Sequence, residues 1–324
     1  MTVTDIEKEK TVHVGVAMPQ FTPEEDVKNV ADRATELAAE AEQQGIGTVW
    51  FNQGAAHDAI VLAAAVGRDV PRISVGTAVV PMHPRHPQLL ASAAKTAQAV
   101  TRGRFRLGLG LGAPDLLTHA YGLPYPPPIT HLREYLGALR PLLDGETTSF
   151  EGTTLQSHPV GPTAVAGAEP EIPVIVAAMG PQALRVAGEL ADGTMPFLAG
   201  PRTLAGHIVP RITEAAARAG RPAPRVIASV PAIVTDDVEQ ARAAAVARLA
   251  FYDSIPSYRR IVEREGAGRA VDLALIGDEA TVAAGLRRYA EAGATEITVA
   301  YTDIAREEDR RRTWQLAGEL TRTT

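Results

Sequence analysis

Apolar and polar positions follow their most regular pattern between Arg72 and Gly112. Residues 73–80 form a short apolar run rich in β-branched side chains, which is typical of a buried strand. Prolines interrupt the chain, and a helix is predicted from Pro87 to about Thr101. Residues 105–111 then alternate large apolar side chains with arginine and glycine. A strand, a helix and a second buried strand predict a parallel βαβ unit, with both strand ends on one edge of the sheet.

The same alternation of short apolar runs and amphipathic helices extends along the chain. Further strands are predicted at residues 12–18, 48–51, 173–178, 193–196, 226–234 and 296–301, and helices at 23–45, 58–67, 129–143, 181–190 and 279–292. Thr22 is the predicted N-cap of the first helix, and residues 113–128 are a predicted proline-rich loop. Eight strands, each followed by a helix, predict a (β/α)8 TIM barrel with insertions after strands 4 and 7. These insertions begin near Phe150 and span Phe251–Leu275.

The predicted domain organisation is simple. Residues 12–324 are expected to form a single domain, because barrels of this length are commonly undivided. Residues 1–11 are polar and charged, so we expect a flexible leader and not a signal peptide.

Composition excludes several functional classes. The 324 residues carry a formal net charge of −6, and the arginines are scattered, which argues against a nucleic-acid partner. No apolar run reaches the roughly 20 residues that span a bilayer. The sequence contains no cysteine, which excludes disulfides, thiolate metal sites, Fe–S clusters and a cysteine nucleophile. We therefore expect a cytoplasmic enzyme without a metal centre and without a membrane partner.

Two long blocks carry a resemblance to a known family. GTAVVPMHPRHP, a helix and GRFRLGLGLG form the first, and IPVIVAAMGPQALRVAGELADGTMPFLAGPRTL forms the second. Both resemble the luciferase-like monooxygenase superfamily, in particular its F420-dependent oxidoreductases. The resemblance implies a TIM barrel that binds coenzyme F420 at the carboxyl ends of its strands.

The resemblance also implies where the cofactor lies. A non-proline cis peptide at Ala78–Val79 would support the deazaflavin ring from behind, and the phosphate of F420 would lie at Met179–Gln182. Free backbone N–H groups at that helix N-terminus suit an anion, and Arg202 could be a second partner. The full predicted set of cofactor-binding residues is Asn52, Gln53, Thr77, Ala78, Val79, Val80, Gly110, Met179, Gly180, Pro181, Gln182, Thr194, Met195 and Arg202.

The glycines of GLGLG do not form a dinucleotide fingerprint, because the third glycine is misplaced and no helix follows directly. We expect them to allow close approach by the cofactor or by side chains inside the barrel. Asp192 is expected to brace neighbouring backbone.

Histidines are the candidate proton-transfer groups, because their pKa lies near neutrality. We name His83 and His119 as candidate catalytic residues. His57 and His131 border other strand-end loops, and the sequence does not choose among them. His86, just before Pro87, is expected to begin a helix.

Two departures from the family pattern argue against sugar-phosphate oxidation. The sugar-phosphate dehydrogenase branch has an aspartate and a catalytic histidine where this chain has Asn52 and Gln53. Ala113 stands where that branch has a glutamate. Neutral amides can hydrogen-bond but cannot shuttle protons.

Three functions remain open. The first is F420-dependent hydride transfer to or from a small organic substrate, with Tyr121, Tyr125, Phe197 and Tyr252 as pocket walls. The second is an FMN-dependent monooxygenase that uses reduced flavin and O2. The third is a catalytically silent barrel subunit, for which the neutral Asn52–Gln53 pair is the best support. A homodimer is expected by analogy with the family.

Overall fold

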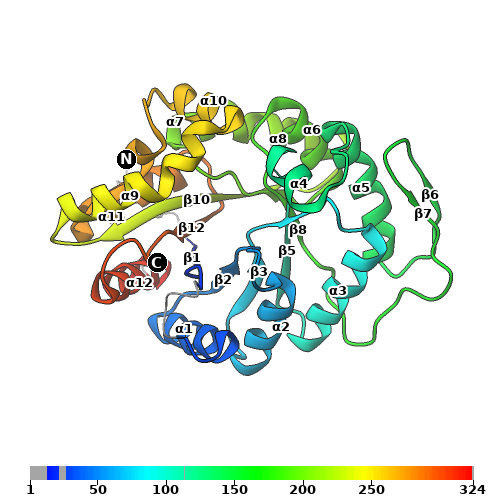
Figure 1. The fold of residues 1–324 in the computed structure, drawn as a ribbon, viewed down its shortest axis with the longest axis horizontal. Helices are drawn as coiled ribbons and strands as arrows, with labels where there is room; N and C mark the ends of the chain where they lie inside the picture. The colour runs from blue at the N-terminus through cyan, green and yellow to red at the C-terminus, as the bar shows by residue number, and fades with distance from the viewer. Residues whose placement is uncertain (1–12, 22–26, 113, 323–324) are drawn as a thin grey trace, which may run out of the picture.

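A computed structural model describes residues 13–21, 27–112 and 114–322. In that part of the chain, eight parallel strands close into a barrel (Figure 1). In chain order they are β1 (Val14–Ala17), β2 (Thr48–Phe51), β3 (Ser74–Thr77), β5 (Phe105–Gly110), β8 (Val174–Val176), β9 (Gly193–Thr194), β10 (Arg225–Val234) and β12 (Glu296–Ala300). Strand β10 closes the barrel because it pairs with β9 on one side and with β12 on the other. The predicted (β/α)8 fold is confirmed.

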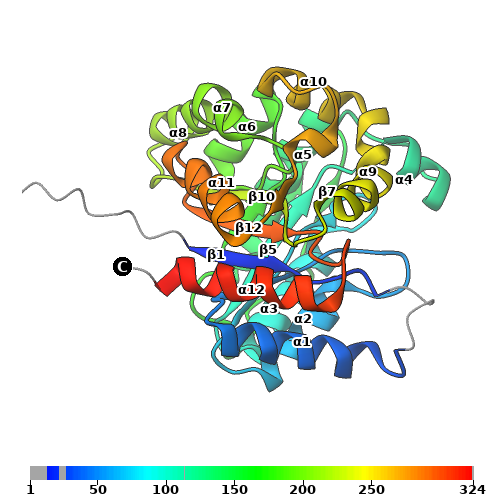
Figure 2. The same ribbon diagram turned by 90° about the vertical axis from the view of Figure 1, so that its left-hand side faces the viewer.

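Helices surround the barrel. They are α1 (Val30–Gln44), α2 (Ala59–Asp69), α3 (Pro87–Val100), α5 (Pro128–Leu143), α6 (Pro181–Leu190), α8 (Val209–Arg218), α11 (Glu279–Glu291) and α12 (Glu307–Arg322). Figure 2 shows α12 beside α1, where Arg310 forms an ion pair of 2.9 Å with Glu40. None of the helices in the described ranges combines the length and the apolar character needed to cross a membrane.

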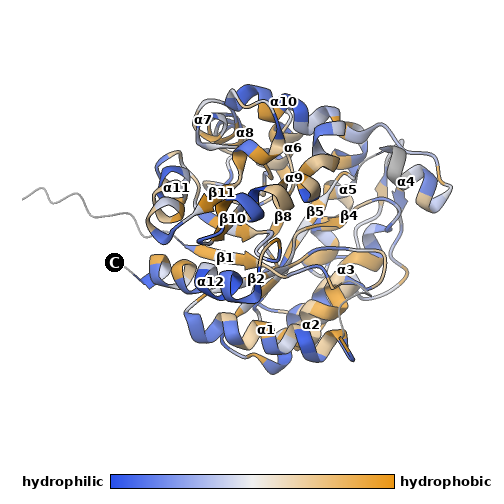
Figure 3. Ribbon diagram, turned by 60° about the vertical axis from the view of Figure 1, so that its left-hand side comes forward, coloured by the Kyte–Doolittle hydropathy of each residue, from blue (hydrophilic) through white to orange (hydrophobic). Residues whose placement is uncertain are grey.

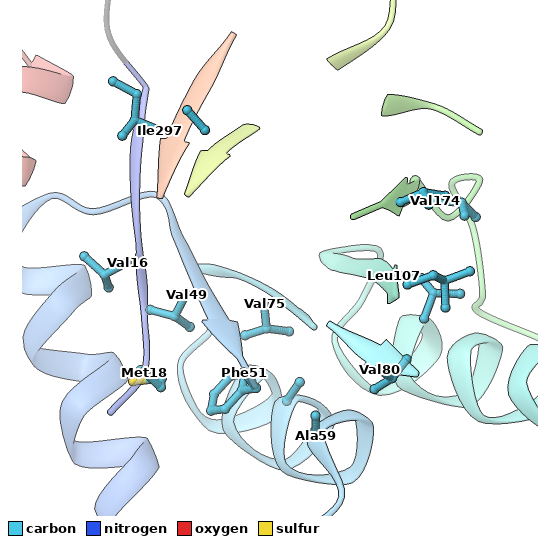
Figure 4. Close-up of a cluster of buried hydrophobic side chains, with 14 of the residues drawn as sticks. Val16, Met18, Val49, Phe51, Ala59, Val75, Val80, Leu107, Val174 and Ile297 are labelled. Carbon is cyan, nitrogen blue, oxygen red and sulfur yellow. The ribbon is translucent and has the colours of Figure 1, made fainter. Parts of the chain in front are cut away.

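The side chains of the barrel strands alternate between two apolar layers. One layer packs against the helices, and Figure 4 shows Val16, Val49, Val75, Leu107, Val174 and Ile297 in it. The other layer is a separate cluster formed by Trp50, Ile175, Met195 and Ile227. Trp50 is paired with Gly76, where a Cβ atom would lie 2.5 Å from the indole ring. Period-two alternation explains both layers, and Figure 3 shows apolar strands enclosed by helices with polar outer faces.

The helix starts test two of the sequence predictions. His86 is the N-cap of α3, because its Nδ1 accepts a hydrogen bond of 3.2 Å from the Gln88 backbone N–H. This confirms that the His86–Pro87 pair begins a helix. The predicted cap at Thr22 and the leader of residues 1–11 lie outside the described residues. Within the described residues, α1 begins at Val30, and Asn29 caps it.

One predicted loop is wrong in part. A helix, α4 (Pro114–Tyr121), lies within the expected loop of residues 113–128. Eight residues are too few to show a helical period in the sequence, and Gly122, with a φ of 64°, follows the helix.

The remaining elements lie between the barrel strands and their helices. They are β4 (Val80–Pro81), β6 (Phe150–Glu151), β7 (Gln156–Ser157), α7 (Pro201–Thr203), the π-helical turn η1 (Leu204–Ile208), α9 (Val238–Ser254), α10 (Pro256–Glu265), the 3-10 turn η2 (Ala270–Leu273) and β11 (Leu275–Gly277). The hairpin of β6 and β7 begins at Phe150, where the first insertion was predicted, and projects beyond α3 and α5 (Figure 1). The second predicted insertion contains α10, η2 and the start of β11.

Candidate active site

A cavity of about 260 Å³ opens at the carboxyl ends of the barrel strands. This is the edge where TIM barrels hold their active sites. The cavity is lined by Ala17, Met18, Gln20, Asn52, Gln53, Ala78, Val79, Phe197, Ser229, Arg248, Tyr252, Tyr258, Ala300, Tyr301 and Asp303. Four of these residues, Asn52, Gln53, Ala78 and Val79, belong to the predicted cofactor set.

One wall of the cavity is the segment Ala78–Val79 between β3 and β4. Its peptide bond is cis, as the resemblance implies. Thr77 holds the segment from behind, because its Oγ1 donates to the Gly108 carbonyl at 2.8 Å and accepts from the Gly108 N–H at 2.9 Å. A Cβ atom at Gly108 would lie 1.8 Å from the Thr77 carbonyl oxygen. Backbone contact across these two strands therefore positions the wall.

Three predicted cofactor contacts lie behind this wall and do not line the cavity. Thr77 and Val80 are fully buried. Gly110 lies against the side chain of Val79, and a Cβ atom there would be 2.6 Å from Val79 Cγ2. The glycine makes room for a neighbouring side chain, which was one of the two roles expected for it.

The neutral amide of Gln53 braces the loop after β2. Its Nε2 donates to the His57 carbonyl at 2.9 Å, and its Oε1 accepts from the Ala59 N–H at 3.1 Å. Arg85 donates to the same oxygen at 3.0 Å. These bonds occupy the amide, so Gln53 lines the cavity mainly as a fixed support, and Asn52 beside it supplies the second amide.

Helix α6 begins at the end of β8 and has no side-chain cap. Gly180 is the N-cap residue, and Pro181 occupies the first turn. His207 Nε2 donates to the Met179 carbonyl at 2.8 Å and so fixes the preceding loop. Gly180 and Gln182 are exposed, and their backbone N–H groups are open to an anion, whereas Pro181 has no N–H to offer.

Arg202 lies on the surface at the start of α7. The carboxylate of Glu265 accepts hydrogen bonds from the Arg202 and Thr203 N–H groups, at 3.1 and 2.7 Å, so this helix start already holds an anion. Only the exposed guanidinium of Arg202 remains for a ligand.

Thr194 and Met195 lie beneath the site. The Thr194 hydroxyl donates to the Val176 carbonyl oxygen at 2.9 Å and so ties β9 to β8. Met195 is buried inside the barrel, in the cluster on which Ala78 and Val79 pack. Asp192 accepts a hydrogen bond of 2.7 Å from the Val174 N–H and pairs with Arg140 and Arg221, which confirms its expected bracing role.

An aromatic wall lines the cavity, and sequence analysis identified only part of it. Phe197 and Tyr252 were named as pocket walls, whereas Tyr258 and Tyr301 were not. The Phe197 ring stacks on Tyr301 at 5.7 Å and meets Tyr252 edge-on at 4.9 Å. Burial raises the pKa of the three tyrosine hydroxyls, so they stay protonated at neutral pH. Arg248 and Asp303, joined by an ion pair of 3.0 Å, were also missed.

The two other predicted wall residues are not among those that line this cavity. Tyr121, on α4, is 48% exposed. Tyr125 donates its hydroxyl hydrogen bond to the Leu111 carbonyl at 2.7 Å.

The candidate histidines do not line the cavity either. His83 lies in a second cluster, where its ring centroid is 6.3 Å from that of His131. The Nε2 atoms of both rings and the hydroxyl of Tyr135 are buried without a hydrogen-bond partner in the described structure. His119 is exposed on α4. The catalytic roles of His83 and His119 stay predictions. The described residues contain no cluster of three or more metal-ligating side chains.

Replacing His131 with asparagine is expected to make the protein lose less of its free energy of unfolding when the pH is lowered. Burial lowers the pKa of His131 from 6.5, and the neighbouring His83 lowers it further, while Glu134 raises it. Below about pH 6.5 the unfolded chain therefore binds a proton on His131 that the folded chain does not. As the pH is lowered, this uptake favours the unfolded chain, and the free energy of unfolding decreases. We expect His131→Asn to reduce this fall, between about pH 7.5 and 5.5, by at most about 1 kcal/mol.

Urea unfolding at several pH values measures this effect. His13→Asn, which changes an exposed histidine at the amino-terminal end of the barrel, is the matched control. An unchanged pH slope in His131→Asn would show that His131 does not contribute.

Comparisons with known proteins agree with this geometry. A family model described as luciferase-like monooxygenase matches residues 12–296. A Mycobacterium tuberculosis protein, provisionally named a coenzyme F420-dependent oxidoreductase, is 30% identical over 240 residues, which cover 67% of each chain.

Two solved structures share the fold. The coenzyme F420-dependent tetrahydromethanopterin reductase of Methanopyrus kandleri matches with a TM-score of 0.77 and 22% identity, over 95% of this chain and 97% of that one. The oxygenating constituent of a diketocamphane monooxygenase from Pseudomonas putida, in complex with FMN, matches with a TM-score of 0.75 and 18% identity, over 96% and 98%.

Proposed function

The chain belongs to the luciferase-like monooxygenase family, and from that premise we propose that it is an F420-dependent oxidoreductase. The cavity at Ala78–Val79 is the observation that carries the proposal. It lies at the carboxyl ends of the barrel strands, and small side chains at Ala17, Ala78 and Val79 leave room for a flat ring.

The fit of a tricyclic ring rests on the glycines behind the wall. Gly108 and Gly110 lack the Cβ atoms that would push Thr77 and Val79 forward. The cavity is therefore bounded by the Ala78–Val79 segment and also by the aromatic side chains of the wall described above. A planar ring with polar edges suits such a site, because aromatic side chains and polar groups line it together.

The anionic tail of F420 is assigned to the start of α6. This helix has no side-chain cap, and its first turn carries the exposed residues Gly180, Pro181 and Gln182. The helix dipole and free N–H groups favour a phosphate there. Arg202, at the start of α7, supplies a second, charge-assisted contact through its exposed guanidinium.

F420, when bound, supplies hydride exchange at C5 of its deazaflavin ring. The chain's own residues position the reactants. The Ala78–Val79 wall orients the ring, Asn52 offers an uncharged amide, and the aromatic wall excludes water from the substrate. His83 and His119 remain candidate proton donors.

Separate titrations of the purified protein with F420 and with FMN test this proposal. We expect F420 to bind at micromolar concentration or tighter, and to be reduced or oxidised with a carbonyl or alcohol substrate. Tight binding of FMN alone, with O2-dependent turnover, would replace the proposal with the monooxygenase function. Cofactor binding without turnover across a substrate panel would favour the silent subunit.

The remaining expectations complete the proposal. Residues 12–324 form one domain that takes a small-molecule substrate, without nucleic-acid or membrane partners. The protein acts as a homodimer in the cytoplasm.

A further inference from the structure

Two tyrosine hydroxyls lie together in the lining of the active-site cavity. The hydroxyl oxygens of Tyr252, on α9, and Tyr301, just after β12, are 2.7 Å apart. Both residues line the cavity, and both are only partly exposed. The two side chains come from elements about 50 residues apart in the sequence, so the closed barrel alone brings them together.

The number of protons in this pair has a chemical consequence. Two hydroxyls carry two protons, and their mutual hydrogen bond uses one of them. In the described structure the bond between them is the only one that either hydroxyl makes with the protein. One O–H donor is therefore left over in the cavity wall.

The surroundings hold this donor in place and keep it neutral. Phe197 stacks on the ring of Tyr301, and Tyr258 packs edge-on against Tyr252 at 4.8 Å. Arg248 lies 5.8 Å from the centroid of the Tyr301 ring, and its charge is balanced by Asp303 at 3.0 Å. Aromatic rings surround the hydroxyl donor that the pair leaves over, and the nearby Arg248 is balanced by Asp303. This arrangement fits an uncharged substrate that presents an oxygen acceptor.

We infer that the Tyr252–Tyr301 pair binds the oxygen of an apolar ketone, aldehyde or alcohol and exchanges the proton that accompanies hydride transfer. The substrate assignment rests on the proposed function. In the reducing direction, the carbonyl carbon gains a C–H bond through the hydride, and the deazaflavin is thereby oxidised. The C=O π electrons pass to the oxygen, which takes the hydroxyl proton. Solvent returns a proton to the tyrosine pair.

Oxygen recognition can be tested without any cofactor. Binding of acetophenone labelled with 13C at the carbonyl is followed by NMR, and ethylbenzene, of similar shape but without the oxygen, serves as the comparison ligand. We expect the wild-type protein to prefer acetophenone by about tenfold, with a downfield shift of the bound carbonyl signal, because one hydrogen bond separates the two ligands.

The double variant Tyr252→Phe/Tyr301→Phe removes both hydroxyls and keeps both rings. Replacing both partners of a buried hydrogen bond by apolar groups of the same shape is nearly neutral for folding. We expect it to lose the preference and the shift, whereas Tyr121→Phe, on the exposed surface of α4, keeps both. An unchanged preference in the double variant, or no preference in the wild type, would overturn the inference.

A second measurement addresses proton exchange. In the F420-loaded enzyme, the double variant is expected to lower kcat for carbonyl reduction by about 100-fold, with an unchanged Kd for F420. If F420 does not bind at all, the proposed function fails while the acetophenone experiment still stands. A wild-type kcat in the double variant would remove the pair from proton exchange.

Discussion

Gly108→Ala is expected to lower the free energy of unfolding by more than about 3 kcal/mol, because it forces a methyl group into closely packed backbone. The new Cβ atom would lie 1.8 Å from the Thr77 carbonyl oxygen and 3.2 Å from Val79 Cγ1. The φ of Gly108 lies outside the left-handed region, so the penalty comes from this contact and not from backbone strain. Strands β3 and β5 would have to separate, and the wall formed by Ala78 and Val79 would move with them.

Urea denaturation measures this change, and F420 titration of the remaining folded protein reports on the wall. Gly206→Ala is the matched control, because a Cβ atom there meets no atom within 4 Å. A Gly108→Ala protein with the stability and F420 affinity of the wild type would show that contact between these two strands does not position the wall.

Ser229→Trp is expected to weaken F420 binding by about 100-fold while the barrel stays folded. Ser229 lies on β10, and its side chain lines the cavity. An indole there would occupy space that we assign to the ring of F420. It would keep about 120 Å² of that ring's surface from contact with the protein, somewhat less than the roughly 150 Å² that a small aromatic side chain buries. At about 25 cal/mol per Å², this corresponds to about 3 kcal/mol, or about 100-fold in Kd.

Fluorescence titration with F420 gives the Kd, and thermal unfolding verifies the fold. Ser92→Trp, at an exposed position on α3, introduces the same side chain away from the cavity and should bind like the wild type. Wild-type affinity in Ser229→Trp would place the ring outside this cavity.

The barrel could be predicted because each strand shows its structure in its own short stretch of sequence, as an apolar or alternating run. Residues 105–111 alternate apolar side chains with arginine and glycine, and the structure confirms that Leu107 and Leu109 are buried in the layer that packs against the helices. Helix α4 escaped prediction because a single short helix has no repeated period.

Cofactor contacts were harder to predict, because a residue at the end of a strand can either pack against other protein residues or line the cavity and contact the cofactor. Val80 and Gly110 lie near the predicted ring, yet they contact protein and do not line the cavity. Only the pairing of β3 and β5 decides which side chains face the cavity.

The aromatic wall shows the limit of local reasoning most clearly. Phe197 and Tyr252 were predicted as pocket walls, but Tyr258, which belongs to the second insertion as Tyr252 does, was not. Tyr301 follows the last strand of the barrel and meets Tyr252 only through the closed fold. No spacing in the sequence indicates that two hydroxyls lie 2.7 Å apart.

A crystal structure of the protein grown with saturating F420 tests the central claim most directly. We predict electron density for the deazaflavin ring against the Ala78–Val79 peptide, with its phosphate at the first turn of α6. Density for the ring at any other place, or an empty cavity in crystals of protein that binds F420 in solution, would contradict the account.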